Sequence, residues 1–332
     1  MQTVVITGGT DGLGKGLALH YLRQGARVIA VGSTPAKGEA FLTEAVEVVE
    51  AVEAAQEAGT AGAAGTNRAA NTARTAEATG ITEATETTET DRSTSRATFL
   101  RADLTSVRAT RDLITTLEGL SPAVDKLILC AQRYRLFGPR TTTREGFEHS
   151  FALAYLSRFV LSHGLRRLLE AAPRPVIMNV GTPGVPLGRI HWDDPQLARH
   201  DRRDSRYSGT KATLQSFRAN DLLGVAFAAL YPHTPVRYIG YNPGIVSTGM
   251  PAHLPGPLRP LAKAAFAVCA TSVAKAVTPM TGLLDDPPGD PFTAYRTKRR
   301  LALKGRAFDP DAALRLHHLT RDLLDAAVPG AV

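Results

Sequence analysis

The first forty residues contain the pattern that most restricts the fold. The β-branched run "TVVIT" (3–7) predicts a strand, which leads into the turn "GGTDGLGKG" and then the helical pattern "LALHYLRQG". Gly25 marks the end of that helix, and "RVIAVG" (27–32) predicts a second strand. A glycine turn between strand and helix lets the backbone approach a pyrophosphate, while the helix N-terminus offers free N–H groups. We therefore expect a dinucleotide site near the N-terminus.

Strands and helices continue to alternate along the chain. Further strands are predicted at 97–104, 126–131, 175–181 and 236–244, and helices at 107–119, 148–170 and 208–230. A last helix is predicted to begin at Pro310, with Asp309 as its N-cap. This alternation predicts the α/β class: a doubly wound parallel sheet (Rossmann fold) in a single domain covering residues 1–332.

Two segments interrupt the alternation. In residues 59–95, Ala, Thr, Glu and Gly dominate and large apolar residues nearly vanish, so burial cannot offset chain entropy. We expect a disordered surface insertion there, and we favour an inert linker over a partner-binding segment. Residues 251–290 are Pro-rich and apolar, which predicts a substrate lid, although an oligomer contact would have the same composition.

Composition narrows the class of protein. The 332 residues include two cysteines, too few for a disulfide framework, and contain no long uncharged apolar run and no signal-peptide pattern. The net charge of +8 is spread along the chain without interleaved aromatics, which argues against a nucleic-acid partner. His317 and His318 are adjacent and would lie on different sides of a helix, so we expect no metal site. The expectation is a soluble cytoplasmic protein without a membrane span.

The stretch "RYSGTK" (206–211) places Tyr207 and Lys211 four residues apart. The phenol of a free tyrosine has a pKa of about 10. A neighbouring ammonium lowers that pKa by stabilising the phenolate. Positions i and i+4 share one face of a helix. This spacing predicts Lys211 beside Tyr207, where it would make Tyr207 a general acid/base for an alcohol or carbonyl.

These motifs together resemble the short-chain dehydrogenase/reductase family. TGxxxGxG, an Asp after the third strand (Asp103), YxxxK and a later NPG occur in the family's order over residues 1–41 and 97–250. The segments "GFEHSFALAYLSRFVLSHGL" and "GRIHWDDPQLARH" are similar to those of its retinol-dehydrogenase-like and carbonyl-reductase branches. The resemblance implies a nicotinamide cofactor and hydride transfer.

The resemblance also assigns residues to roles. It implies a catalytic set of Tyr207, Lys211 and Thr182, and a cofactor-binding set of Gly8, Thr10, Gly12, Leu13, Gly14, Ser33, Asp103, Leu104, Ala131, Tyr207, Lys211, Pro243, Gly244, Ile245 and Thr248. A carboxylate at the end of the second strand would select NAD(H). "AVGSTPAKG" has none, and Ser33, Thr34 and Lys37 suit a 2′-phosphate, so we expect NADP(H) over NAD(H).

Three positions depart from the family pattern. Thr182 stands where the family has a serine, and its hydroxyl can donate the same hydrogen bond. Ala154 stands where the family has the Asn of a proton relay, and Leu129-Cys130-Ala131-Gln132 replaces Asn-Asn-Ala-Gly. These changes affect proton delivery more than cofactor binding.

The leading hypothesis is an NAD(P)-dependent oxidoreductase that interconverts a carbonyl and an alcohol on a small, lipophilic or secondary-metabolite substrate. One alternative is the same fold used for non-redox isomerisation or cyclisation in biosynthesis. Another is a dinucleotide-binding sensor or scaffold with weak catalysis. A homodimer and a homotetramer both stay open.

Overall fold

The strands form one sheet whose order reverses near its middle. The computed structural model describes residues 1–63, 96–133, 135–199, 207–246 and 271–329. Its eight strands follow the order β3-β2-β1-β4-β5-β6-β7-β8, all parallel to their neighbours except β8, which is antiparallel to β7. The strands are β1 (Thr3–Thr7), β2 (Arg27–Gly32), β3 (Ala97–Arg101), β4 (Lys126–Leu129), β5 (Val176–Val180), β6 (Arg237–Asn242), β7 (Phe292–Arg296) and β8 (Arg299–Arg300). Neither β7 nor β8 is among the predicted strands.

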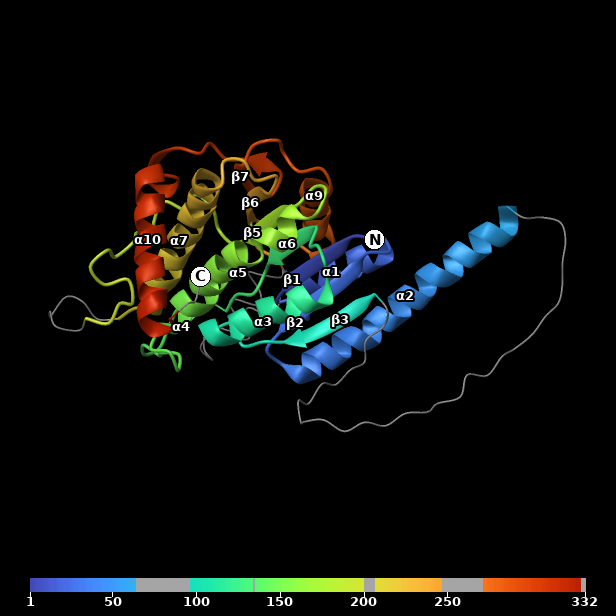
Figure 1. Cartoon of the computed structure of the whole chain (residues 1–332), viewed down its shortest axis with the longest axis horizontal. Coiled ribbons are helices and arrows are strands. Elements are labelled where there is room, and N and C mark those ends of the chain that lie inside the picture. The colour runs from blue at the N-terminus through green and yellow to red at the C-terminus, as the bar shows by residue number, and fades with distance from the viewer. Residues whose placement is uncertain (64–95, 134, 200–206, 247–270, 330–332) are drawn as a thin grey trace.

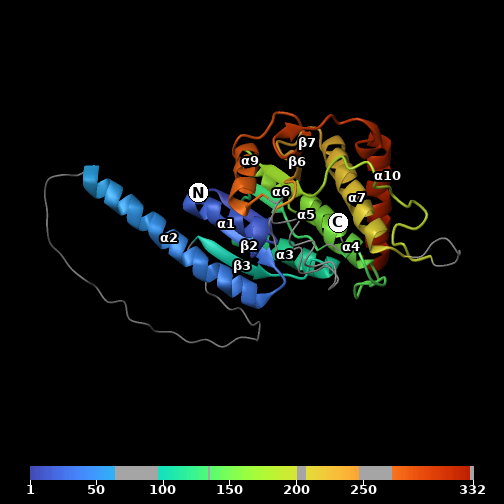
Figure 2. The same cartoon turned by 180° about the vertical axis from the view of Figure 1, so that it is seen from behind.

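Helices cover both faces of the sheet, as Figures 1 and 2 show. Because strand side chains alternate, Val5 of β1 packs with α3, α5, α7 and α10, while Val4 and Ile6 pack with α1, α2 and α9. The helices are α1 (Gly12–Arg23), α2 (Pro35–Ala63), α3 (Val107–Leu120), α4 (His149–Phe151), the π-helix η1 (Ala152–Leu156), α5 (Ser157–Gly164), α6 (Arg166–Glu170), α7 (Gly209–Leu230), α9 (Val273–Asp285), the 3₁₀-helix η4 (Gly305–Ala307) and α10 (Pro310–Ala327). The prediction of a doubly wound α/β fold is confirmed.

Helix α2 extends into the segment that we predicted as an insertion. It runs through residues 59–63, which we assigned to the insertion, because each residue added to an existing helix gains a backbone hydrogen bond. Residues 64–95, the rest of the predicted insertion, lie outside the described residues. Among the described helices, none is both long and apolar enough to cross a bilayer.

Part of the predicted lid belongs to the helical layer on the sheet. Residues 251–270 lie outside the described residues, whereas Val273–Asp285 form α9. This helix packs closely on α1, since a Cβ added to Gly16 would lie 2.5 Å from Cγ1 of Val273. The lid interpretation of 251–290 therefore rests on the residues before α9.

Two histidines are buried between α5 and α10. The rings of His163 and His317 lie 5.0 Å apart between centroids, and Nδ1 of His163 is 3.1 Å from the Tyr231 hydroxyl. Burial lowers the pKa of His163 to about 3 and that of His317 to about 4. Both imidazoles are therefore neutral in the folded chain near pH 7, whereas unfolded histidines bind protons below about pH 6.5.

This pair predicts an acid-sensitive fold. The folded pKa values of the two histidines lie below the unfolded ones. Their contribution to the free energy of unfolding is therefore fully present above about pH 6.5 and is lost progressively as the pH falls toward 4. We expect the melting temperature to fall between pH 6.5 and 5. His317→Gln should reduce that slope, whereas His318→Gln, at the exposed neighbouring position, should retain it. Equal slopes in all three proteins would contradict the assignment.

Candidate active site

The carboxyl ends of the parallel strands bring the predicted site residues to one edge of the sheet. The strand order reverses between β1 and β4, and open α/β sheets bind ligands at such a switch point. The loops that leave this edge hold Gly8 to Gly14 after β1, Ser33 after β2, Asp103 and Leu104 after β3, Ala131 after β4, Thr182 after β5, and Pro243 to Ile245 after β6.

The turn after β1 has a backbone shape that favours glycine. Gly8 and Gly12 have φ values of +67° and +50°, in the left-handed region. A Cβ on Gly14 would lie 2.2 Å from the carbonyl oxygen of Gly8, so the turn and the first turn of α1 meet backbone to backbone. The carboxylate of Asp11, the N-cap of α1, accepts a hydrogen bond from the N–H of Gly12 at 2.7 Å.

The same turn rests on the loop after β4. A Cβ on Gly8 would lie 3.0 Å from both the nitrogen and Cα of Ala131. The N–H of Ala131 donates to Oγ1 of Thr7 at 3.2 Å. Burial raises the pKa of the neighbouring Cys130 thiol to about 12, so this residue remains a thiol. The loops on the two sides of the switch point are thus fixed to each other.

A basic side chain faces the glycine turn from the start of α2. Nζ of Lys37 is 2.5 Å from the Asp11 carboxylate, and this hydrogen bond lowers the pKa of Asp11. Thr10 lies over the end of β2, where a Cβ on Gly32 would be 2.9 Å from its Oγ1. Ser33 is exposed beside it. The end of β2 therefore presents hydroxyl and ammonium groups.

The loop after β3 combines a polar turn with a buried anchor. Oδ1 of Asp103 accepts hydrogen bonds from the backbone N–H of Thr105 at 3.0 Å and from its hydroxyl at 2.7 Å. Leu104 is buried among the core residues on the α3 side of the sheet. This arrangement holds both predicted adenine-side residues at the sheet edge.

A buried arginine, absent from the predicted site, joins the ends of β4 and β5. Arg158 of α5 is 2% exposed and donates to the carbonyl oxygens of Ala131 at 3.0 Å and Val180 at 2.8 Å. It also donates to Oε1 of Gln132 at 2.9 Å and to Oδ1 of Asn179. The sequence signal was an arginine inside the apolar run "YLSRFVLS", at a helix position that faces the core.

A chain of amides continues from this arginine to the position of the lost Asn. Nδ2 of Asn179 donates to Oδ1 of Asn220 at 2.9 Å, and Nδ2 of Asn220 donates to the carbonyl oxygen of Ala154 at 2.7 Å. Ala154 lies in the π-helix η1, whose wider turn breaks the regular pattern of helical hydrogen bonds. Asn220 of α7 thus binds the backbone carbonyl of Ala154, one of the positions where the sequence departs from the pattern it resembles.

Thr182 borders a small cavity below the loop after β5. Asn179, Asn220 and Asp221 also line this cavity, whose volume of about 10 Å³ is at the lower limit for one water molecule. Burial raises the pKa of Asp221, while the N–H of Gly184 and the charge of Arg218 act in the opposite direction. The structure therefore places Thr182 beside amide and carboxyl groups at the predicted strand end.

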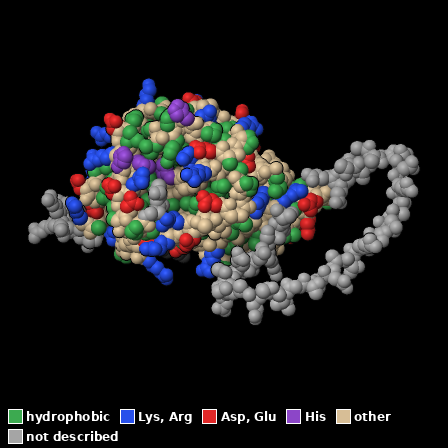
Figure 3. Space-filling view, viewed as in Figure 1, with side chains coloured by type: hydrophobic (Ala, Val, Ile, Leu, Met, Phe, Trp, Pro, Cys, Tyr) green, Lys and Arg blue, Asp and Glu red, His purple; other side chains and the backbone are tan. Residues whose placement is uncertain are grey.

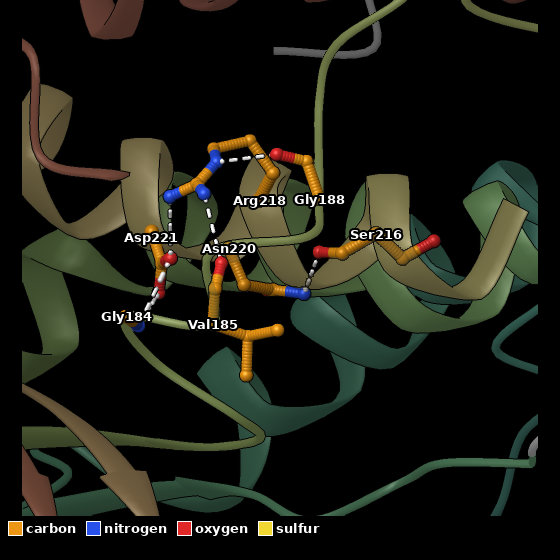
Figure 4. A network of polar contacts seen from close by, with 7 residues as sticks. All are labelled: Gly184, Val185, Gly188, Ser216, Arg218, Asn220 and Asp221. Atoms are coloured by element: carbon orange, nitrogen blue, oxygen red, sulfur yellow. Dashed lines mark hydrogen bonds and ion pairs between the residues drawn. The ribbon is translucent and has the colours of Figure 1, made fainter. Parts of the chain in front are cut away.

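Two paired side chains of α7 bind the backbone of the Thr182 loop, as Figure 4 shows. Arg218 lies 3.2 Å from Asp221, and it donates to the carbonyl oxygens of Val185 at 2.8 Å and Gly188 at 3.1 Å. Asp221 in turn accepts from the N–H of Gly184 at 3.2 Å. Both charged side chains are buried, so the loop after β5 is held by satisfied polar groups.

The structure corrects the predicted Tyr207–Lys211 pair. Helix α7 begins at Gly209, because the hydroxyl of the N-cap Ser208 accepts the N–H of Lys211. Tyr207 therefore lies outside the helix, and the i, i+4 argument does not apply to it. Its hydroxyl donates to Oε1 of Glu148 at 2.9 Å. Burial and the Glu148 charge raise the pKa of Tyr207, the opposite of the predicted direction.

Lys211 lies on the first turn of α7, with its side chain exposed. Burial, with the charges of Arg189 and Lys211 nearby, lowers the pKa of His191 in the loop after β5. Lys211 thus acts on the loop that follows Thr182.

The loop after β6 completes the edge. Gly244 has a φ of +75°, and its N–H donates to Oδ1 of Asn242 at 2.8 Å, which turns the chain sharply. Pro243 precedes it, and Ile245 is 52% exposed. Thr248, predicted to complete this group, lies outside the described residues.

The residues at this edge fit a dinucleotide. Glycines leave the backbone of the β1 turn uncovered, the N-terminus of α1 points to the turn, and Lys37 balances the charge of Asp11. The hydroxyl of Thr182 and the Tyr207 loop lie at the same sheet edge.

Comparison with known proteins gives a consistent family. The short chain dehydrogenase family model matches residues 2–76. A protein of Streptomyces sp. strain C5, named as a daunorubicin C-13 ketoreductase, is 28% identical over 74% of this chain and 67% of its own length. Retinol dehydrogenase 14 of Mus musculus is 29% identical over 78% of this chain and 66% of its own length. The chain thus spans about two thirds of the length of these relatives.

Solved structures share the fold. A short chain dehydrogenase from Salmonella enterica serovar Typhi has a TM-score of 0.57 at 15% identity, covering 90% of this chain and 96% of the other. A Shigella flexneri structure described as a short chain dehydrogenase complexed with NADP has the same TM-score and identity, covering 90% and 97%.

The close contact at Gly14 predicts a sharp effect of one methyl group. Gly14→Ala would place Cβ against the Gly8 carbonyl, so the β1 turn must shift, and we expect at least a tenfold loss of cofactor affinity and a lower melting temperature. Gly119→Ala in α3 is the control, since a Cβ there meets nothing within 4 Å and should raise helix stability by up to about 1 kcal/mol. Fluorescence titration measures the cofactor affinity of each variant, and thermal melting measures its stability. An unchanged cofactor affinity in Gly14→Ala would contradict the role of this turn in cofactor binding.

Proposed function

The chain belongs to the short-chain dehydrogenase/reductase family, and from that premise we propose that it is an NAD(P)-dependent oxidoreductase interconverting a carbonyl and an alcohol. The observation that carries the proposal is the glycine turn after β1, held against Ala131 at the switch point of the sheet. This turn leaves a backbone surface to which a pyrophosphate can bind.

The roles proposed for individual residues follow the family pattern. The pyrophosphate would be bound by Gly8, Thr10, Gly12, Leu13 and Gly14, and the adenosine phosphate by Ser33 and Lys37. The adenine would lie against Asp103 and Leu104, and the adenosine ribose against Ala131. The nicotinamide ribose would be bound by Lys211, and the carboxamide by Pro243, Gly244, Ile245 and Thr248. The bound nicotinamide supplies or accepts the hydride. Tyr207 would donate or accept the proton of the substrate oxygen, and Thr182 would orient that oxygen with a hydrogen bond.

The proposed substrate is a lipophilic ketone, aldehyde or alcohol. The edge of the sheet at the carboxyl ends of the strands, here called the active edge, carries exposed large apolar side chains on three loops. These are Phe137 after β4, Leu187 after β5 and Ile245 after β6, with exposed fractions of 60%, 76% and 52%. These loops follow adjacent strands of the sheet, and exposed apolar side chains on them favour an apolar ligand. The names of the relatives refer to daunorubicin, retinol and polyprenol, all with large apolar portions.

Non-redox acid catalysis is the second candidate, and one observation favours it. Tyr207 contacts Glu148 instead of Lys211, which keeps the phenol protonated. An isomerase or cyclase needs only such an acid. Consumption of reduced cofactor during turnover separates the two functions, since isomerisation leaves the nicotinamide absorbance unchanged.

The proposed partner is a small molecule bound in the cytoplasm. On the face shown in Figure 3, Lys and Arg side chains are scattered among acidic and apolar ones, so this face has no continuous basic surface for nucleic acid. A homodimer and a homotetramer both remain compatible with the proposal.

The end of β2 predicts a preference for NADPH over NADH. Ser33 and Lys37 offer a hydroxyl and an ammonium to a 2′-phosphate, and one charged hydrogen bond corresponds to roughly a tenfold difference in affinity. Lys37→Ala should remove most of that difference, whereas Lys15→Ala, whose side chain pairs with Glu44, should keep it. Cofactor fluorescence titration measures the ratio, and equal or reversed affinities in the native chain would refute the preference.

Tyr207→Phe tests the proposed chemistry directly. Loss of the phenolic proton should lower kcat for reduction of a lipophilic carbonyl by about 100-fold or more. Cofactor affinity should fall far less than kcat, since the other residues of the cofactor-binding set are intact. Tyr231→Phe is the matched control, since Tyr231 lies after the opposite end of α7 and contacts His163. Absorbance at the nicotinamide band follows turnover. Native activity in the Tyr207 variant would exclude this residue as the acid.

A further inference from the structure

Glu148 is a buried carboxylate that the sequence analysis assigned no role. It is 1% exposed and stands immediately before α4, at the end of the long loop that follows β4. Oε1 accepts the N–H of Ser150 at 3.0 Å, and Oε2 accepts the N–H of Phe151 at 2.7 Å. These two bonds fix the plane and direction of the carboxylate, as expected for an N-cap side chain.

The third group on this carboxylate is the hydroxyl of Tyr207. The phenol oxygen lies 2.9 Å from Oε1 of Glu148, the same oxygen that accepts the backbone N–H of Ser150. A phenolate at this distance from a carboxylate would be opposed by a like charge. Besides Glu148, the charge that acts on the phenol is that of Arg135, in the loop after β4, and a hydrogen bond with the side chain of Ser150 acts in the same direction as Arg135.

The backbone around Glu148 is held as firmly as its side chain. The N–H of Glu148 donates to Oε1 of Gln196 at 2.7 Å, in the loop after β5. Nε2 of Gln215 on α7 donates to the carbonyl oxygen of Pro195 at 2.7 Å, next to Gln196. Three segments of the active edge therefore converge on Glu148: the loops after β4 and β5, and helix α7.

We propose that Glu148 is the positioning residue for Tyr207. Its carboxylate contacts the phenol where the family resemblance expects the ammonium of Lys211, keeps the phenol protonated, and so directs the site toward carbonyl reduction. This inference rests on the proposed function. In reduction Tyr207 is needed as the phenol, which donates a proton to the substrate oxygen. In oxidation it is needed as the phenolate, which Glu148 opposes.

The reductive step balances with groups already named. The O–H bond of Tyr207 breaks and its proton forms the new O–H bond of the alcohol. The carbonyl carbon receives the hydride from the reduced nicotinamide, which is thereby oxidised. Tyr207 is left as a phenolate beside Glu148, and that unfavourable pair regains a proton from water. Return of the proton restores the hydrogen bond to Oε1.

Ionisation of residue 207 tests the proposal without any turnover. A 3,5-difluorotyrosine placed at position 207 has a more acidic phenol and can be titrated by ¹⁹F NMR in the folded chain. In the native background it should ionise at a higher pH than the free amino acid. Glu148→Gln keeps an acceptor for the hydroxyl but removes the charge, and should shift ionisation down by about one pH unit or more.

Glu145→Gln is the matched control on the same loop. Glu145 accepts hydrogen bonds from Ser106 and Val107 at the start of α3, and none of its hydrogen bonds involves Tyr207. Its substitution should leave the ionisation of residue 207 unchanged. The same ionisation pH in the native and Glu148→Gln chains would overturn the proposal. If Glu148→Gln does not fold, ionisation of the native chain at or below the pH of the free amino acid overturns it equally.

Kinetics then separate this inference from the proposed function. The alkaline limb of the pH profile for reduction should move to lower pH in Glu148→Gln, and the ratio of oxidation to reduction at high pH should rise. A shifted ionisation with an unshifted pH profile would refute the directing role of Glu148. A shifted ionisation in a chain that reduces no carbonyl would reject the proposed function and leave the Glu148–Tyr207 coupling in place.

Discussion

The guanidinium of Arg158 lies where β4 and β5 end, and the loops of the candidate site depend on its hydrogen bonds. Its acceptors belong to the loop that faces the glycine turn and to the residues just before Thr182. A buried acceptor left without its donor costs about 1–3 kcal/mol, so these groups hold one another in register. Because a Cβ on Gly8 would touch Ala131, the same arginine also supports the cofactor turn indirectly.

Buried polar side chains order the candidate site at positions where the sequence departs from the pattern it resembles. Ala154 provides no side-chain amide, yet Asn220 reaches its carbonyl from α7 and joins it to Asn179. The amide that contacts η1 is therefore supplied by α7. Glu148 shows a similar substitution, since a carboxylate occupies the place beside Tyr207 that the family pattern gives to an ammonium.

The sequence predicted those features that local patterns determine. β1 and β2 have the predicted bounds, and the glycine turn lies where its spacing places it, because both depend on neighbouring residues. The contact of Tyr207 depends on where α7 begins, and Ser208, a good N-cap, was the available signal for that start. The long-range contacts of Arg158, Asn220 and Glu148 could not be predicted, since Asn179, Ala154 and Tyr207 are 21, 66 and 59 residues away from them in the chain.

The path of α2 has a practical consequence for handling this protein. The helix begins at Pro35, at the active edge after β2, and extends to Ala63. Strand β3 begins at Ala97. Parallel strands all begin at the edge opposite the active edge, and Figure 1 shows the far end of α2 extending away from the sheet. An affinity tag or fluorescent label attached near Ala63 would therefore stand on the side remote from substrate and cofactor. The protein could be immobilised through this label with the candidate active site facing the solution.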